Sequence, residues 1–336
     1  MVGISVELVE NPTDILEFLQ LGINIPVREE FHEFILRDLK MYQAKSLILI
    51  EDNKVIAHTL AYDDGSEVLY FGFFGVIGHE EKYIEYLLEE LIQYAQKHHY
   101  TLINGPINPP TFIFGYGFMT EDSLNELCIS KPINPPIYQE IFFKYGFYII
   151  SKQGTLEGDI FKVPEEELKK YDFAGYEIHS PKNWDEFPKL KLPLLMLSAR
   201  NLETESRVTP GSEKMFENFF SFLKTYGKIY MVKLLRHNPS KQFVGCFITL
   251  PDPIKKNRNG KLNSFVGYSL TIDKEHRGKG LSVYLVKNIY DAAYEDGVRY
   301  ISVPMEINVN ECRNLATDHF GLSCTRTHLI LERKVE

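Results

Sequence analysis

The chain has 336 residues, which is long for a single hydrophobic core and favours two domains of about 150 residues each. Its composition, 44% hydrophobic and 25% charged, is that of an ordinary globular protein, and its net charge of −9 argues against a general nucleic-acid binder. No apolar stretch approaches the ~20 residues that span a bilayer, and no basic segment precedes an apolar run at the N-terminus. We therefore expect a cytoplasmic protein.

The first half predicts a mixed α/β order of elements. Residues 28–42, for example, place Phe31, Phe34, Ile35 and Leu39 at the spacing of a helix with one buried face. In chain order we expect a strand at 4–10, helices at 12–22 and 28–42, strands at 46–50, 55–62 and 68–76, a helix at 80–99 and a strand at 101–105.

The second half repeats this order. We expect a strand at 176–179, helices at 184–200 and 213–226, strands at 229–235, 243–250 and 264–272, a helix at 282–295 and a strand at 299–305. The charged segment 163–170 reads as a linker between the halves. The predicted domains are therefore residues 1–163 and 172–336.

The halves differ where a glycine loop and a long insert occur. Gly72 and Tyr100 are 28 positions apart, whereas their counterparts Gly267 and Tyr300 are 33 apart, so the first half lacks room for the loop of the second. The first half instead carries an aromatic, glycine-rich insert at 105–118, followed by a proline-rich stretch. Such an insert either lines a substrate pocket or packs its aromatic side chains under itself.

The loop Arg277-Gly278-Lys279-Gly280-Leu281-Ser282 lies between a predicted strand and a predicted helix. The first N–H groups of a helix have no intrahelical partner and carry partial positive charge, so the loop is suited to a phosphate or pyrophosphate. It is not a Walker loop, because Lys279 is not followed by Ser or Thr, and the three spaced glycines of the dinucleotide fingerprint are absent. The alternative interpretation is a solvated basic turn.

The order Arg-x-x-Gly-x-Ser, then a strand, then Asn310, then Gly321-Leu322 eleven residues later resembles the GCN5-related N-acetyltransferase (GNAT) family, which binds acetyl-CoA. The family has Gly or Ala where this chain has Ser282. The first half resembles the degenerate N-terminal half of tandem members of that family. The resemblance implies an α/β fold with a mixed sheet, two tandem GNAT-like domains, and an acetyl-CoA site in the second domain.

The resemblance also implies the residues of that site. Loop amides would bind the pyrophosphate with help from two basic side chains, and the strand before the loop would pair with the pantetheine arm and offer an N–H group to the oxyanion. Asn310 would contact the cofactor arm, act as a helix cap, or do both. The predicted cofactor-binding residues are Leu270, Thr271, Ile272, Arg277, Gly278, Lys279, Gly280, Leu281, Ser282 and Asn310.

The general acid and base are less clearly marked. Many family members have a tyrosine seven positions after the asparagine, where this chain has Thr317, a poor acid at neutral pH. Tyr268, His319 or water could protonate the thiolate instead, and Glu306 is the candidate base, although each side chain could also be purely structural. The predicted catalytic set is thus Glu306, Tyr268 and Thr317.

The expected activity is transfer of an acetyl or acyl group from acetyl-CoA to an amine in a ternary complex, with acetyl-CoA as cosubstrate and no metal. The four cysteines form no metal-site or disulfide pattern. The expected partner is a small-molecule or peptide amine, with no nucleic acid and no membrane, and a homodimer is left open. The alternatives are a non-catalytic acyl-CoA sensor and, with less support, a tRNA-dependent aminoacyl transferase of the peptidoglycan type.

Overall fold

The computed structural model describes residues 3–201, 213–307 and 314–335. Its strands are β1 (Ser5–Val9), β2 (Lys45–Glu51), β3 (Lys54–Tyr62), β4 (Val68–Val76), β5 (Leu102–Gly105), β6 (Phe118–Met119), β7 (Tyr148–Asp159), β8 (Tyr176–His179), β9 (Val232–His237), β10 (Gln242–Pro251), β11 (Ser264–Ile272), β12 (Tyr300–Glu306) and β13 (Ser323–Lys334). The α-helices are α1 (Pro12–Ile15), α2 (His32–Met41), α3 (Glu81–Lys97), α4 (Thr111–Phe114), α5 (Ile137–Lys144), α6 (Glu165–Leu168), α7 (Phe187–Asn201), α8 (Glu213–Tyr226) and α9 (Leu281–Glu295).

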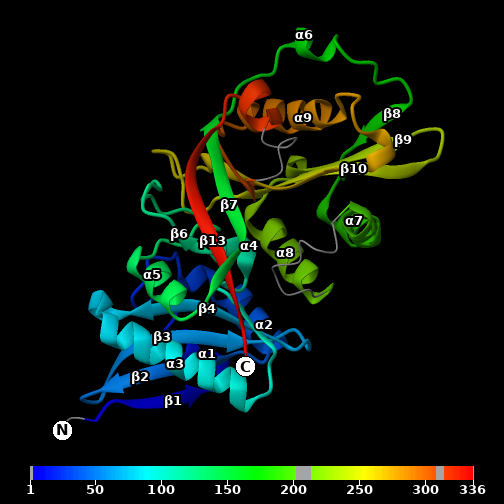
Figure 1. Ribbon diagram of the computed structural model, residues 1–336. Helices are drawn as coiled ribbons and strands as arrows, with labels where there is room; N and C mark the ends of the chain where they lie inside the picture. Colours follow the sequence, from blue (N-terminus) through cyan, green and yellow to red (C-terminus); the bar gives the residue numbers. More distant parts are fainter. Residues whose placement is uncertain (1–2, 202–212, 308–313, 336) are drawn as a thin grey trace.

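The described strands form one mixed sheet with the order β1-β2-β3-β4-β5-β13-β7-β12-β11-β10-β9-β8, and β6 adds to β13. In each half, four strands pair antiparallel before a short parallel pair, β4 with β5 and β11 with β12. The long helices α3 and α9 are the crossovers between these parallel strands (Figure 1). The predicted mixed sheet and the repeated order are confirmed.

One helix was predicted to be longer than it is. The helix expected at 12–22 ends at Ile15, and the chain then turns toward β4. A Cβ atom on Gly75 would lie 1.7 Å from the carbonyl oxygen of Leu21, so backbone is packed directly on backbone there. This close tertiary packing replaces the helical turns that the apolar spacing predicted.

The last strand of each half lies in the sheet of the other half, which the sequence did not predict. Strand β7, from the first half, pairs with β12 from Asp159 opposite Tyr300 to Gln153 opposite Glu306. Strand β13, at the end of the chain, pairs with β5 and also with β7. The two strands cross the middle of the molecule side by side, β7 in green and β13 in red (Figure 1). Strand pairing therefore runs without a break from the first half to the second through β13 and β7, and the division into two domains stays a prediction.

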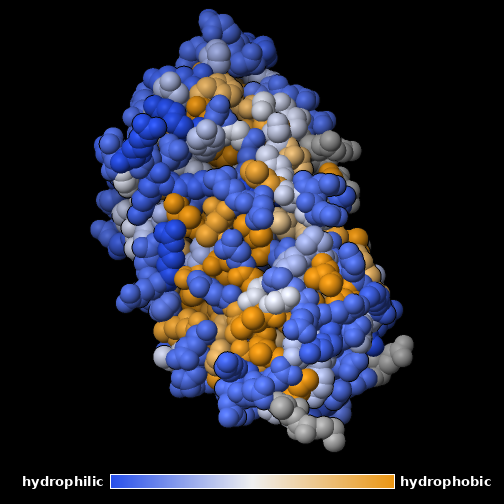
Figure 2. All heavy atoms as spheres, turned by 90° about the vertical axis from the view of Figure 1, so that its left-hand side faces the viewer, coloured by the Kyte–Doolittle hydropathy of each residue, from blue (hydrophilic) through white to orange (hydrophobic). Residues whose placement is uncertain are grey.

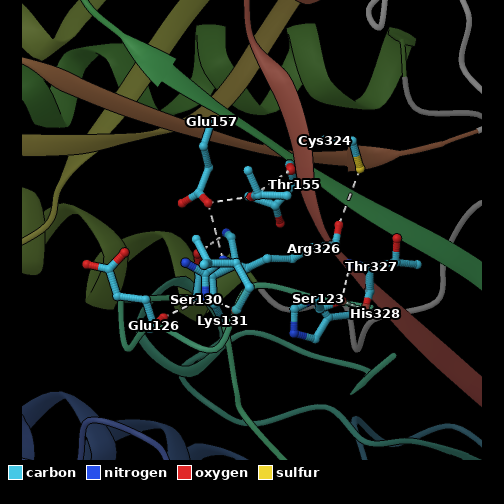
Figure 3. A network of polar contacts seen from close by, with 12 residues as sticks. Ser123, Glu126, Ser130, Lys131, Thr155, Glu157, Cys324, Arg326, Thr327 and His328 are labelled. Carbon is cyan, nitrogen blue, oxygen red and sulfur yellow. Dashed lines mark hydrogen bonds and ion pairs between the residues drawn. The ribbon is translucent and has the colours of Figure 1, made fainter. Parts of the chain in front are cut away.

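A buried polar network joins this crossing to the insert of the first half (Figure 3). The side chain of Arg326 on β13 is 0% exposed, and its Nε lies 3.3 Å from Oε2 of Glu157 on β7. Its Nη1 donates to the carbonyl oxygens of Leu124 and Glu126 at 2.8 and 2.5 Å. A single guanidinium thus connects the two exchanged strands to the segment that follows β6.

Two further buried bases lie in this network. The Lys131 ammonium donates to Oγ of Ser130 at 2.8 Å, and burial lowers the pKa of Lys131 to about 8. Burial lowers the pKa of His328 to about 3, so its ring is neutral at physiological pH, and its Nε2 lies 3.0 Å from the carbonyl oxygen of Pro132. Arg326 therefore makes more of the polar contacts in this network than Lys131 or His328 does.

The surface is not evenly polar. Hydrophobic residues gather over the middle of the face on the left of Figure 1, between hydrophilic areas above and below them (Figure 2). Among the described helices, none combines the length and the apolar character that crossing a membrane would require.

Candidate functional site

A gap opens between two parallel strands of the second half. Strands β11 and β12 pair only from Ser264 opposite Tyr300 to Val266 opposite Ser302. Beyond Val266 the two strands diverge, and among the described strands β11 keeps a neighbour only on its β10 side. An exposed strand edge of this kind can pair with an extended ligand.

The corresponding gap in the first half is filled by the insert. The N–H group of Ile107 donates to the carbonyl oxygen of Phe71 at 2.7 Å, and Oδ1 of Asn108 accepts from the N–H group of Phe73 at 2.6 Å. A Cβ atom on Gly72 would lie 2.2 Å from the carbonyl oxygen of Ile107. The insert therefore occupies the space that remains open in the second half.

The open gap contains an apolar cavity of about 150 Å³. Its walls come from the facing parts of β11 and β12, from α9, and from the segment that follows the undescribed residues 308–313. The residues that line it are Phe247, Gly267, Tyr268, Leu270, Val286, Tyr290, Ile301, Val303, Pro304, Met305, Leu315, Ala316, Phe320 and Leu322. A narrow apolar slot beside a strand edge suits a flexible aliphatic amide chain, such as the pantetheine arm.

The glycine loop lies at the mouth of this gap, where α9 begins. Gly280 is the N-terminal cap of α9 with a φ of 71°, and the first intrahelical bond runs from the N–H group of Tyr284 to the carbonyl oxygen of Gly280 at 3.1 Å. The N–H groups of Leu281, Ser282 and Val283 precede that bond, so helix geometry leaves them without intrahelical acceptors. The space around Gly278 is open, since an added Cβ would meet nothing within 4 Å. The loop therefore fits a diphosphate.

The two predicted basic side chains of the loop already have protein partners. Nε of Arg277 donates to the carbonyl oxygen of Ile272 at 3.0 Å, which ties the loop to the end of β11. Nζ of Lys279 donates to the hydroxyl of Tyr176 at 2.9 Å, and that hydroxyl also lies 2.8 Å from Nδ1 of His276. Direct phosphate contacts from Arg277 and Lys279 stay a prediction and would require these bonds to be exchanged.

The segment that directly follows the predicted linker contributes aromatic residues that the sequence did not assign to the site. A Cβ atom on Gly280 would lie 2.3 Å from the ring of Tyr171, so that ring packs directly against the loop. The ring of Phe173 stacks on Tyr284 of α9 at 4.5 Å. The chain that follows α6 therefore crosses over the start of α9, above the helix in Figure 1.

Two predicted catalytic residues, Tyr268 and Glu306, both lie within electrostatic reach of Tyr116 in the insert. Tyr268 on β11 lines the cavity, keeps 41% of its surface exposed, and stacks on Phe219 of α8 at 4.5 Å. Although much of the residue is exposed, protein surrounds its hydroxyl, and this burial, followed by the charges of Tyr116 and Asp38, raises the pKa of Tyr268, so its phenol keeps its proton at neutral pH. Glu306 at the end of β12 helps to raise the pKa of Tyr116 after burial, which places that carboxylate beside the insert.

The other predicted site residues differ in where they lie relative to the cavity. Thr317 lies in a short π-helical turn, Leu315–His319, and its hydroxyl is 2.9 Å from Oδ1 of the neighbouring Asp318. Asn310 falls outside the described residues. Leu270 lines the cavity, and Thr271 and Ile272 continue β11 toward the loop, so their contacts with the cofactor stay a prediction. Among the described residues, no group of His, Cys, Asp and Glu is arranged to hold a metal ion.

The first half supplies a buried carboxyl group to the same region. Asp38 on α2 is 1% exposed, and its Oδ1 accepts from Nδ2 of Asn218 on α8 at 2.7 Å. Burial raises the pKa of Asp38 from 3.8 to about 7, against the opposing effect of the Asn218 bond. Burial, with the charge of Asp38 among the smaller causes, also raises the pKa of Tyr42, Tyr62 and Tyr268. Asp38 therefore lies within electrostatic reach of the cavity wall.

The raised pKa makes stability depend on pH. Between pH 3.8 and about 7 the unfolded chain ionises Asp38 more readily than the folded chain does, so this group lowers stability as pH rises through that window. Asp38→Asn should remove the effect and gain about 2 kcal/mol on the parent between pH 5 and pH 8. Urea unfolding of both proteins at the two pH values measures this difference, and an identical pH dependence would contradict it.

No protein-family model and no curated protein sequence matches the chain, but solved structures do. A tandem GNAT protein from the clavulanic acid biosynthesis pathway matches with a TM-score of 0.62 at 13% identity, over 99% of both chains. A GCN5-related N-acetyltransferase from Sphaerobacter thermophilus matches with a TM-score of 0.61 at 9% identity, over 98% of this chain and 96% of the other.

A third match is a region of a larger protein. The GCN5-related glucosamine N-acetyltransferase region of a fungal multi-domain β-N-acetylglucosaminidase matches with a TM-score of 0.63 at 13% identity, over 99% of this chain and 38% of that one. At such low identities these matches establish the fold. The chain has the tandem GNAT fold along nearly its whole length.

Proposed function

We propose that this chain, which has the tandem GNAT fold, is an acyltransferase that moves an acetyl group from acetyl-CoA to an amine. The observation that carries the proposal is the gap between β11 and β12, which contains an apolar cavity and has at its mouth a glycine loop that is open at Gly278 and covered by Tyr171 at Gly280. The corresponding gap of the first half is filled by its own insert, so the proposed donor site lies in the second half.

Each part of this site has a chemical task. The amides of residues 278–282 would hold the diphosphate, and the apolar slot would take the pantetheine arm along the free edge of β11. Holding the thioester against this edge allows a backbone N–H group near Leu270 to stabilise the oxyanion. The protein groups thus position and polarise the thioester carbonyl, and the thioester itself supplies the activated acyl group.

Tyr268 is the best-placed group to protonate the departing thiolate, because it lines the cavity and keeps its proton. Tyr268→Phe should lower kcat about a hundredfold and leave acetyl-CoA affinity unchanged, since the phenol acts only in the chemical step. Thr317→Ala is the matched comparison and should have a small effect. Steady-state kinetics that show an unchanged kcat for Tyr268→Phe would remove Tyr268 from this role.

The deciding experiment is calorimetric titration with acetyl-CoA, followed by a thiol-release assay with amines. Acetyl-CoA binding with CoA release establishes the proposed enzyme. Binding without release from any amine favours the acyl-CoA sensor, for which the weak acid Thr317 at the usual tyrosine position is the supporting observation. Failure to bind acetyl-CoA would refute both. The net charge of −9 disfavours a tRNA-dependent transferase.

A further inference from the structure

Three buried polar atoms around Asp38 have no hydrogen-bond partner in the described structure. They are Oδ2 of Asp38, Oδ1 of Asn218 and the hydroxyl of Tyr42. Buried polar groups are nearly always hydrogen-bonded, and each unsatisfied group costs about 1–3 kcal/mol. Three such atoms from two helices at one place indicate a site for a ligand that donates hydrogen bonds.

The cluster lies where the two halves meet. Asn218 on α8 joins them, because its Nδ2 donates both to Oδ1 of Asp38 and, at 2.8 Å, to the carbonyl oxygen of Phe34 on α2. The next residue on α8, Phe219, stacks on Tyr268 at the wall of the cavity. The charge of Asp38 also contributes to the raised pKa of Tyr268, so the polar cluster lies close to the cavity wall that Tyr268 forms.

The free atoms are all able to accept hydrogen bonds. Asp38 offers a carboxylate oxygen, Asn218 an amide oxygen and Tyr42 a hydroxyl oxygen. The groups that face Asp38 from the surrounding elements are the amide of Asn218 on α8 and the phenols of Tyr42 after α2, Tyr62 on β3 and Tyr268 on β11. None of these carries a positive charge that would neutralise Asp38. An ammonium group, with three donors and a positive charge, would satisfy all three acceptors.

We propose that Asp38, Asn218 and Tyr42 bind the amino group of the acceptor, so that the first half supplies the amine site and the second half the thioester site. This proposal rests on the proposed function. Asp38 would take one proton from the bound ammonium and leave a neutral amine, whose lone pair attacks the thioester carbonyl carbon. The C–S bond then breaks, Tyr268 gives its proton to the thiolate and takes the second amine proton in return, and Asp38 releases its proton to solvent.

The test compares the parent with Asp38→Asn, which keeps the shape of the side chain and removes its charge. The probes are glucosamine, spermidine and lysine amide, assayed by CoA thiol release and by thermal shift without CoA. We expect Asp38→Asn to raise KM for the best amine about tenfold or more, with unchanged acetyl-CoA affinity. The amine should also stabilise the parent thermally and have little effect on the variant.

A second variant tests the amine site in case Asp38→Asn fails to fold. Tyr42→Phe removes one acceptor and keeps the ring packed against Tyr62 at 5.1 Å, so it should raise the same KM by a smaller factor. The proposal is overturned if both variants keep the parent KM, or if the amines shift the melting temperatures of parent and Asp38→Asn equally or not at all. Loss of acetyl-CoA binding by the parent would instead refute the proposed function, while the amine thermal shift would still test the Asp38 site.

Discussion

Gly280→Asp should abolish acetyl-CoA binding in a calorimetric titration. The substitution places a negative charge among the amides that would hold the diphosphate, at a backbone φ of 71° that favours glycine. Its Cβ would also lie 2.3 Å from the Tyr171 ring, so the linker must move away from the loop. Repulsion, lost amide contacts and displacement of the linker all act against binding.

Two matched variants separate these causes. Gly297→Asp adds the same charge at a φ of 90° in open space beyond the other end of α9, and it should bind acetyl-CoA as the parent does. Gly278→Asp lies in the loop in open space, away from Tyr171, and it should lose binding. If Gly278→Asp binds normally, the loop amides are not the phosphate site. If Gly297→Asp also fails to bind, the loss reflects a general defect of α9.

Arg326→Ala should lower the free energy of unfolding by about 3–5 kcal/mol, because it leaves a largely buried carboxylate without its cation. Glu157, 15% exposed at its side chain, would lose the guanidinium, and the carbonyl groups of Leu124 and Glu126 would lose their donor. The loss should appear as a lower urea midpoint in equilibrium unfolding.

The control is an ion pair at the surface. Lys162 lies 2.9 Å from Glu295 with both side chains more than half exposed, and Lys162→Ala should leave the urea midpoint unchanged. The double variant Arg326→Met with Glu157→Gln should be less destabilised than Arg326→Ala, since it removes both charges of the pair. Equal midpoints for Arg326→Ala and the parent would show that the network contributes little to stability.

The sequence was sufficient to predict the structural features that depend on residues close to one another in the chain. The glycine loop, the preceding strand and the helix α9 follow from residue types within about one turn of each other, because left-handed glycines and an amphipathic stripe act at short range. The repeated order of the two halves could equally be predicted, since the same elements recur in the same order. The fold and the region of the candidate donor site were therefore accessible before the structure.

The exchange of β7 and β13 between the two halves could not be predicted from the sequence, because no local pattern specifies which distant strand a given strand will pair with. Likewise, the sequence of residues 105–118 does not indicate that Ile107 and Asn108 fill the gap beside β4. Asp38 did leave a signal. It lies on the same helical stripe as Phe31, Phe34 and Ile35, where a carboxylate is out of place unless it is paired or functional.

The position of β13 has a consequence for how the protein is made. The β5 edge of the N-terminal part of the sheet is completed by residues 331–334, which are synthesised long after β5 itself. That part therefore emerges with an uncovered strand edge and must wait for the remainder of the chain before it closes. We expect ribosome-bound intermediates of this protein to depend on chaperones until β13 has been synthesised.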